Sequence, residues 1–149
     1  MKLKRVVSGK GLERAREIIV AANPGREHGS FRFDARYFAL IDAGKMKAVV
    51  GLKRRGRFLT EVKHLAVPEA YRHKGIGGLA LAEALRKVRT PLACATIRAG
   101  NVASLALFKA QGFQVVERFE KDKGNVVLMI RATQAAGRRR GKVPEQAPP

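Results

Sequence analysis

Residues 72–78, with the sequence RHKGIGG, place three basic side chains beside three glycines at the expected start of a helix. Glycines let a backbone approach a ligand closely, the first N–H groups of a helix have no partner within it, and the helix dipole favours an anion there. This pattern predicts a phosphate-binding loop. The alternative interpretation is a plain turn from strand to helix with its basic side chains in solvent.

The elements that must position this loop follow from the spacing of apolar residues. The pattern predicts a helix at 11–23, three strands within 37–67 with short glycine-centred turns at 43–45 and 55–57, a helix at 78–88, a strand at 91–97, a helix at 101–111, and two strands at 113–119 and 125–131 with a turn at 121–124. This order predicts an α/β domain (α+β in the stricter sense) that begins with an antiparallel meander.

Length and composition set further expectations. With 149 residues, 46% of them hydrophobic, the chain has enough material for one globular core. The lone cysteine, Cys94, excludes an intramolecular disulfide, offers no thiolate pair for a metal and is expected to be an inert core residue. No run approaches the roughly 20 apolar residues of a membrane helix, so we expect a cytoplasmic protein with no membrane partner. Residues 133–149 are rich in Pro, Gly and charge, which predicts a basic extension after a domain at 1–132.

The charge is strongly positive, with 31 Lys and Arg against 12 Asp and Glu and a formal net charge of +19. A solvated surface explains such a balance, and so does a nucleic-acid or acidic-protein partner. Aromatic residues make up 6% of the chain and Trp is absent, so we expect any nucleic acid to be bound weakly and mainly through its phosphates.

Two motifs together carry a resemblance to a known family. Arg72, Gly75 and Gly77 fit one signature, and a second follows after one strand at Asn101, Ser104, Leu107, Phe108, Gly112 and Phe113. In type, spacing and order these residues resemble the GCN5-related N-acetyltransferase (GNAT) superfamily over residues 3–132. The resemblance implies a mixed, mostly antiparallel central sheet, splayed around an acyl-CoA cleft and flanked by helices.

The resemblance also implies cofactor-binding residues, with acetyl-CoA as co-substrate and no metal. It assigns the pyrophosphate to Arg72, His73, Lys74, Gly75, Ile76, Gly77 and Gly78, and the pantetheine amides and thioester carbonyl to the main chain of Leu65, Ala66 and Val67. Asn101 is expected to contact the pantetheine arm, directly or through water, and Ser104 and Phe108 belong to the same cofactor segment. Asn101 equally fits a helix N-cap, and the two roles are compatible.

Acetyl transfer to an amine needs a general base, and the resemblance implies Glu61. The alternative for Glu61 is an ion pair with one of the many basic side chains nearby. His64 is a weaker candidate for the base and is expected rather to pack or hydrogen-bond. Phe108 departs from the family, which commonly has a proton-donating Tyr there. The proton for the leaving thiolate then comes from water or another group, or the thiolate leaves unassisted, or the protein binds acyl-CoA without efficient turnover.

We therefore expect an acetyl-CoA-dependent N-acetyltransferase that transfers its acetyl group directly to a primary amine. No nucleophile and base pair is recognisable, which favours direct transfer over a covalent enzyme intermediate. The expected acceptor is a small molecule, a peptide or an aminoacyl-tRNA. The resemblance implies that residues 23–36 and 120–125 shape the site that selects it. The alternative is an acyl-CoA-binding or nucleic-acid-binding module with little turnover, which Phe108 and the net charge favour.

Overall fold

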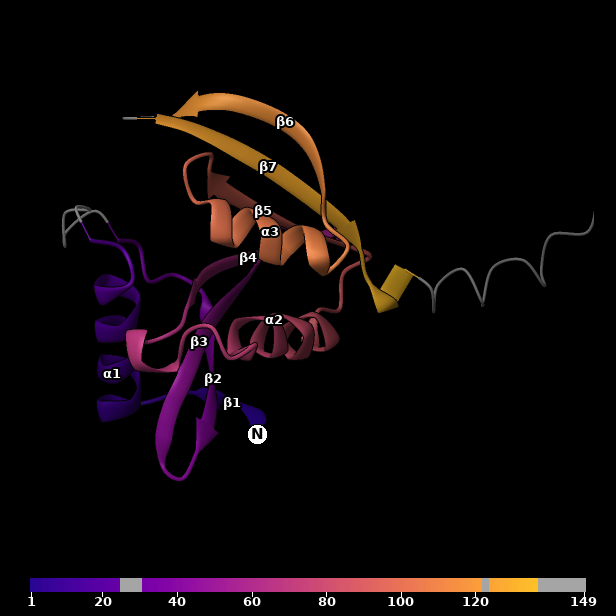
Figure 1. Ribbon diagram of the computed structural model, residues 1–149. Coiled ribbons are helices and arrows are strands. Elements are labelled where there is room, and N and C mark those ends of the chain that lie inside the picture. Colours follow the sequence, from indigo (N-terminus) through magenta and orange to yellow (C-terminus); the bar gives the residue numbers. More distant parts are fainter. Residues whose placement is uncertain (25–30, 122–123, 137–149) are drawn as a thin grey trace, which may run out of the picture. The chain divides into compact units, whose positions relative to one another are not determined.

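The computed structural model describes residues 1–24, 31–121 and 124–136 (Figure 1). Its elements are β1 (Lys2–Val6), α1 (Gly9–Ala21), β2 (Arg36–Asp42), β3 (Lys45–Arg54), β4 (Leu59–Ala66), the short 3-10 helix η2 (Glu69–Tyr71), α2 (Ile76–Lys87), β5 (Leu92–Arg98), α3 (Val102–Ala110), β6 (Gln114–Lys121) and β7 (Gly124–Ala132). The seven strands have the order β1-β2-β3-β4-β5-β7-β6 in a sheet that mixes parallel and antiparallel pairs. The predicted mixed sheet flanked by helices is confirmed.

Two compact units make up the chain. The first consists of Met1–Lys53 and Val62–Ala84, and the second of Arg54–Glu61 and Leu85–Pro149. β4 and α2 therefore each contribute residues to both units. The glycine loop at 72–78 belongs to the first unit, whereas Glu61 and α3 belong to the second.

The core of the first unit forms between α1 and the strands. Ala15, Ile18 and Ile19 share one face of α1 because they recur at helical spacing. They pack in one cluster with Val6, Tyr37, Ala39, Val49 and Ala66 from the first four strands. Leu40 and Val50 alternate with residues of this cluster and are also fully buried, so β2 and β3 are covered on both faces.

In the second unit, β5 lies between β4 and β7. It pairs in parallel with Leu59, Thr60 and Glu61 of β4, and antiparallel with β7 along its whole length. β6 forms the outer edge and pairs antiparallel with β7, with an irregularity between Val115 and Glu117. Met129 and Val127 of β7 are fully buried, so the hairpin of β6 and β7 is anchored through β7.

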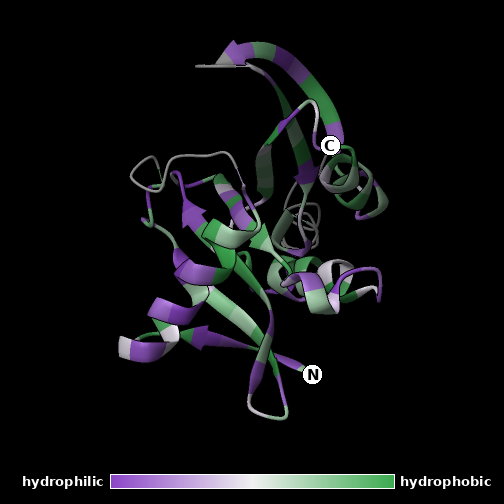
Figure 2. Cartoon of the chain, turned by 60° about the vertical axis from the view of Figure 1, so that its left-hand side comes forward, coloured by the Kyte–Doolittle hydropathy of each residue, from purple (hydrophilic) through white to green (hydrophobic). Residues whose placement is uncertain are grey.

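One strand, β1, was not predicted from the sequence. Only Leu3 and Val6 of its residues are buried, and because they are three apart they give no alternating pattern. The other three residues, Lys2, Lys4 and Arg5, are exposed, and the strand is mostly hydrophilic in Figure 2. β1 pairs with β2 at the edge of the sheet, and exposed Lys residues are a common feature of edge strands.

The chain stays ordered just past β7. The backbone N–H of Thr133 donates to the Pro91 carbonyl at 2.9 Å, and its hydroxyl donates to the Thr90 carbonyl at 2.5 Å. The later part of the predicted extension, residues 137–149, lies outside the described residues, as do 25–30 and 122–123 of the predicted acceptor segments. Within the described part of the chain, no helix combines the length and apolar character needed to cross a membrane.

Candidate functional site

The glycine loop turns into α2 through a left-handed backbone conformation at Gly75. Gly75 has a φ of +77°, and a Cβ added there would meet no atom within 4 Å. Its carbonyl accepts the first helical hydrogen bond of α2, from the Leu79 N–H at 3.1 Å. Ile76 and Gly77 therefore lie in the first turn, where N–H groups have no acceptor within the helix. The first turn of α2 therefore has N–H groups that the helix itself does not use, and their binding of a phosphate stays a prediction.

Arg72 has a second role that the sequence does not reveal. Its Nε donates to the carbonyl of Val67 at 2.8 Å, which ties the loop to the residue that follows β4. Val67 belongs to the backbone predicted to hold pantetheine, so one lone pair of its carbonyl is already engaged. Lys74 and His73 are exposed, and His73 has a φ of +62°. Their basic side chains are thus held beside the start of α2 by a tightly folded loop.

His64 packs and hydrogen-bonds, as expected from the sequence. Its Nδ1 lies 2.8 Å from the Tyr37 hydroxyl, and the two rings stack in parallel at 5.9 Å. The rings of Phe31 and Phe33 lie within 6.1 Å of the imidazole. Burial, followed by the charge of Asp34, raises the pKa of Tyr37 to about 12, so the phenol keeps its proton.

Glu61 lies in an ion pair, the alternative weighed for it from the sequence. Its Oε1 accepts from Arg55 Nε at 2.8 Å and from Arg55 Nη2 at 2.5 Å. Cys94 stands opposite Glu61 in the parallel register of β4 and β5 and is buried. Burial, and after it the Glu61 charge, raises the pKa of Cys94 to about 11, which confirms the expected inert thiol.

Asn101 caps α3. Its Oδ1 accepts from the backbone N–H of Ser104 at 3.2 Å, the hydrogen bond expected of an N-cap residue. The predicted cap is confirmed, and with it the position of Ser104 in the first turn of the helix. Contacts of either residue with a cofactor remain predictions.

The sequence as a whole matches a known family. A model of the acetyltransferase (GNAT) family aligns with residues 13–113, more than half of the chain. The chain belongs to this family. The matched region contains both GNAT motifs, Glu61 and the strands β2 to β5.

Individual proteins are similar to the chain in sequence or in fold. The N-alpha-acetyltransferase RimI of Mycobacterium tuberculosis is 35% identical over 83 residues, which are 54% of this chain and 52% of that protein. The alignment thus spans about half the length of this curated relative. A GNAT acetyltransferase from Elizabethkingia anophelis with acetyl-CoA bound has a TM-score of 0.73 at 15% identity, covering 88% of this chain and 97% of that one. The ribosomal-protein-S18-alanine N-acetyltransferase from Escherichia coli has a TM-score of 0.72 at 18% identity, covering 89% and 93%. At these identities the two structures show a shared fold.

The second GNAT motif has a structural explanation at the end of α3. The Phe113 N–H donates to the Phe108 carbonyl at 3.0 Å, the Gly112 N–H donates to the Lys109 carbonyl at 3.0 Å, and Gly112 has a φ of +88°. These bonds form a Schellman motif, in which the helix ends on a left-handed glycine. The Phe108 and Phe113 rings supply its usual apolar contact, with centroids 5.0 Å apart. Phe108 is only 3% exposed and is therefore first of all a packing residue.

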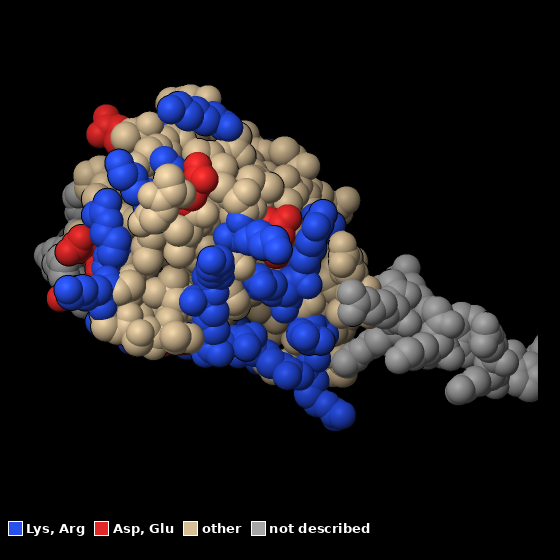
Figure 3. Space-filling view, turned by 90° about the horizontal axis from the view of Figure 1, so that it is seen from below, with Lys and Arg blue, Asp and Glu red and all other residues tan. Residues whose placement is uncertain are grey.

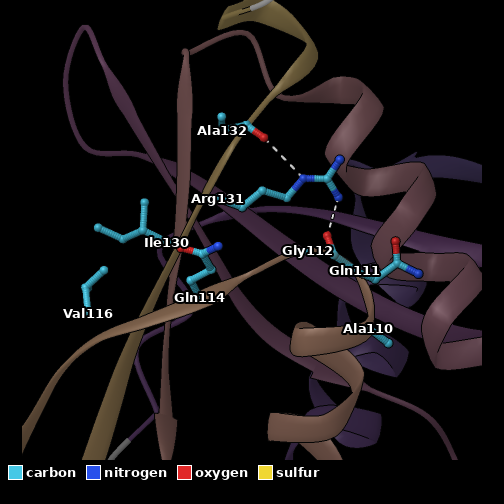
Figure 4. A pocket seen from close by; sticks show the side chains of 8 residues that line it. All are labelled: Ala110, Gln111, Gly112, Gln114, Val116, Ile130, Arg131 and Ala132. Carbon is cyan, nitrogen blue, oxygen red and sulfur yellow. Dashed lines mark hydrogen bonds between the residues drawn. The ribbon is translucent and has the colours of Figure 1, made fainter.

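A separate depression of about 730 Å³ in the second unit is lined by Gly112 of the second motif but by none of the residues predicted to bind the cofactor or to act in catalysis. Figure 4 shows its lining residues from the end of α3 and from β6 and β7, namely Ala110, Gln111, Gly112, Gln114, Val116, Ile130, Arg131 and Ala132. The Arg131 guanidinium donates through Nη1 to the Gln111 carbonyl and through Nε to the Ala132 carbonyl at 3.1 Å. Arg131 therefore helps to fasten the end of α3, a role with no signal in the sequence.

Proposed function

We propose that the chain is an acetyl-CoA-dependent N-acetyltransferase that passes the acetyl group directly to a primary amine. Membership of the acetyltransferase (GNAT) family carries this proposal. The RimI relative supports the reaction class, and the Elizabethkingia anophelis structure with acetyl-CoA bound supports the co-substrate.

The residues of the glycine loop fit the diphosphate of acetyl-CoA. The space beside Gly75 is open, and the first N–H groups of α2 are donors without helical acceptors. Each anion contact at a helix start contributes roughly 0.3–1 kcal/mol. Exposed Lys74 adds positive potential, whereas Arg72 divides its donors between Val67 and any ligand. Bound here, acetyl-CoA would supply the activated thioester.

The chain's own residues would handle the protons. Glu61 accepts a proton from the acceptor ammonium, directly or through water, so that the neutral amine forms the new C–N bond while the C–S bond breaks. Backbone N–H groups around Leu65, Ala66 and Val67 polarise the thioester carbonyl. Phe108 has no proton to give, so in this proposal the departing thiolate takes its proton from water, and that water is restored by the second proton, which leaves the acylated nitrogen.

Two similar proteins support a proposal for the acceptor class. The RimI relative is an N-alpha-acetyltransferase, and the Escherichia coli neighbour is a ribosomal-protein-S18-alanine N-acetyltransferase. We propose a free N-terminal α-amine of a peptide or protein as the first acceptor to assay. Polyamines and aminoacyl-tRNA are the comparison acceptors.

A binding assay paired with a turnover assay tests the proposal. Acetyl-CoA should raise the melting temperature by mass-action linkage, and free thiol should appear when an acceptor is added. Glu61→Gln should lower thiol release severely and leave the acetyl-CoA shift in place. Gly77→Val should remove that shift, whereas Ala82→Val, five residues further along α2, should retain it.

The second candidate is an acyl-CoA-binding module with little turnover. The replacement of a donor by Phe108, and the engagement of Glu61 by Arg55, favour it. A melting shift with acetyl-CoA but no thiol release with peptides, polyamines or aminoacyl-tRNA would decide for this candidate.

A further inference from the structure

The contact between Arg55 and Glu61 is asymmetric. Arg55 Nε and Nη2 both donate to Oε1, at 2.8 Å and 2.5 Å. A guanidinium commonly spreads two donors over the two oxygens of a carboxylate. Here both donors go to one oxygen, and Oε2 accepts no hydrogen bond from the described residues.

The second oxygen is open to solvent. Among the described residues, no buried side-chain oxygen or nitrogen is left without a hydrogen-bond partner. Oε2 has no such partner, and the Glu61 side chain is only 17% exposed, so the little exposure that Glu61 has must include this oxygen. Oε2 therefore keeps some exposure to solvent and is the oxygen of Glu61 left to accept a further hydrogen bond.

Arg55 approaches from a firmly built turn. Its backbone N–H donates to the Leu59 carbonyl at 2.8 Å, and the Nε of Arg54 donates to the Gly56 carbonyl at 2.9 Å. Opposite Glu61 stands the buried Cys94. The carboxylate is thus held between a fixed cation and a strand, which limits its rotation.

We propose that Arg55 is a positioning residue for Glu61, holding Oε1 so that Oε2 faces the acceptor and receives its proton. This inference rests on the proposed function, in which Glu61 is the general base. A misplaced catalytic group can lower turnover by about 100-fold for a shift of about 1 Å. Arg55 also balances the charge of Glu61, so its removal should not weaken the binding of a cationic acceptor.

The test compares kcat and KM in five variants of the full chain. Arg55→Gln removes the guanidinium that donates twice to Glu61, and Arg55→Lys keeps the charge without that paired donation. Arg57→Gln is a matched control on the same turn, with the same loss of charge, at a residue that forms no ion pair with Glu61 among the described residues. Glu61→Gln and the double variant Arg55→Gln with Glu61→Gln complete a double-mutant cycle. The melting shift with acetyl-CoA is measured for each.

We expect Arg55→Gln to lower kcat by about 10 to 100-fold with an unchanged or lower acceptor KM, and Arg55→Lys to recover part of that loss. In the Glu61→Gln background the Arg55 change should have no further effect, because Arg55 acts only through Glu61. The rise in melting temperature caused by acetyl-CoA should be equal in all five variants.

Two results would overturn the inference while leaving the proposed function standing: an Arg55→Gln loss no larger than that of Arg57→Gln, or an equal loss with and without Glu61. A fully active Glu61→Gln variant would instead remove Glu61 as the base, and the role of Arg55 with it.

Discussion

At the scale of single residues, a substitution of Phe108 can add a proton donor while keeping most of the packing of the ring. Its ring is buried against Phe113, so Phe108→Tyr keeps most contacts but must bury a hydroxyl, which costs about 1–3 kcal/mol if it finds no partner. We expect a folded variant whose thiol release rises on the order of tenfold, because a phenol can protonate the thiolate. Phe113→Tyr, the matched buried ring, should give no rise. Unchanged turnover in Phe108→Tyr would show that another donor already serves.

Asp34 gives the protein a stabilising contact that depends on pH. Its carboxylate accepts from Lys53 and, at 2.8 Å, from Lys63, and these bonds hold its pKa well below the ordinary 3.8. A lowered carboxyl pKa stabilises the fold above the unfolded pKa and loses that effect as pH falls through the folded one. The melting temperature of Asp34→Asn should therefore lie below that of the natural chain at pH 7, with a smaller difference at pH 3.

The control for Asp34 is Asp42→Asn. Asp42 is exposed and has no ion pair among the described residues, and its change alters the net charge equally. If Asp42→Asn shows the same dependence on pH, general charge repulsion and not the contact with the two lysines is the cause.

The sequence predicts site residues better than their partners. Residue type and spacing predict the glycine loop and the Asn101 cap, because these are local patterns, whereas the choice of Glu61 rests on the resemblance to the family. The sequence predicts an ion pair for Glu61 but cannot choose Arg55 among so many basic neighbours. The pairing of Tyr37 with His64, 27 residues apart, and the φ of +56° at His64 depend on tertiary packing and leave no local signal.

At the scale of elements, the end of α3 depends on one glycine. Gly112 has a φ of +88°, and its Cβ would meet only Arg131 atoms at ordinary contact distance, 3.7 Å or more. Gly112→Ala should therefore destabilise the fold through the backbone alone, by about 1–2 kcal/mol. This corresponds to a melting temperature lower by roughly 2–8 °C. Gly100→Ala, at an open position outside the left-handed region, should change it little, and equal losses would contradict the Schellman explanation.

The helices and strands were predicted where glycine-centred turns or a regular spacing of apolar residues mark them. Glycine-centred turns separate β2, β3 and β4, and helical spacing marks α1 and α2, so their positions are confirmed within a few residues. β1 was not predicted because its buried residues, Leu3 and Val6, lie three positions apart in a basic segment and give no alternating pattern. Its stability comes from pairing with β2, a contact distant in sequence.

At the scale of the whole molecule, the net charge of +19 predicts weak binding of nucleic acid. In the view of Figure 3, Lys and Arg side chains outnumber the acidic ones on the visible surface. We expect gel shifts with RNA and DNA of any sequence at low salt, with a log–log salt slope of about −0.9 per phosphate neutralised on duplex DNA and about −0.7 on single strands. Deleting residues 138–142, which lie outside the described part, should weaken the shift and leave acetyl-CoA affinity intact.

A comparison variant replaces Lys2, Lys4 and Arg5 of the edge strand β1 by Gln. If both variants weaken the shift in proportion to the charge removed, binding is spread over the surface. No shift even at low salt would remove nucleic acid from the partners and leave a solvated surface as the explanation.

The positions of the two tyrosines bear on how unfolding is observed. The chain has no Trp, so Tyr37 and Tyr71 are its principal intrinsic fluorophores, and both belong to the first unit. Tyr37 stacks on His64, and the Lys47 ammonium lies 3.7 Å from the centre of the Tyr71 ring. Tyrosine emission therefore reports the environment of the first unit, whereas far-ultraviolet circular dichroism reports the helices and strands of both. Coincident denaturation curves from the two signals would mean that the units unfold as one cooperative body, and separated curves that the first unit has a stability of its own.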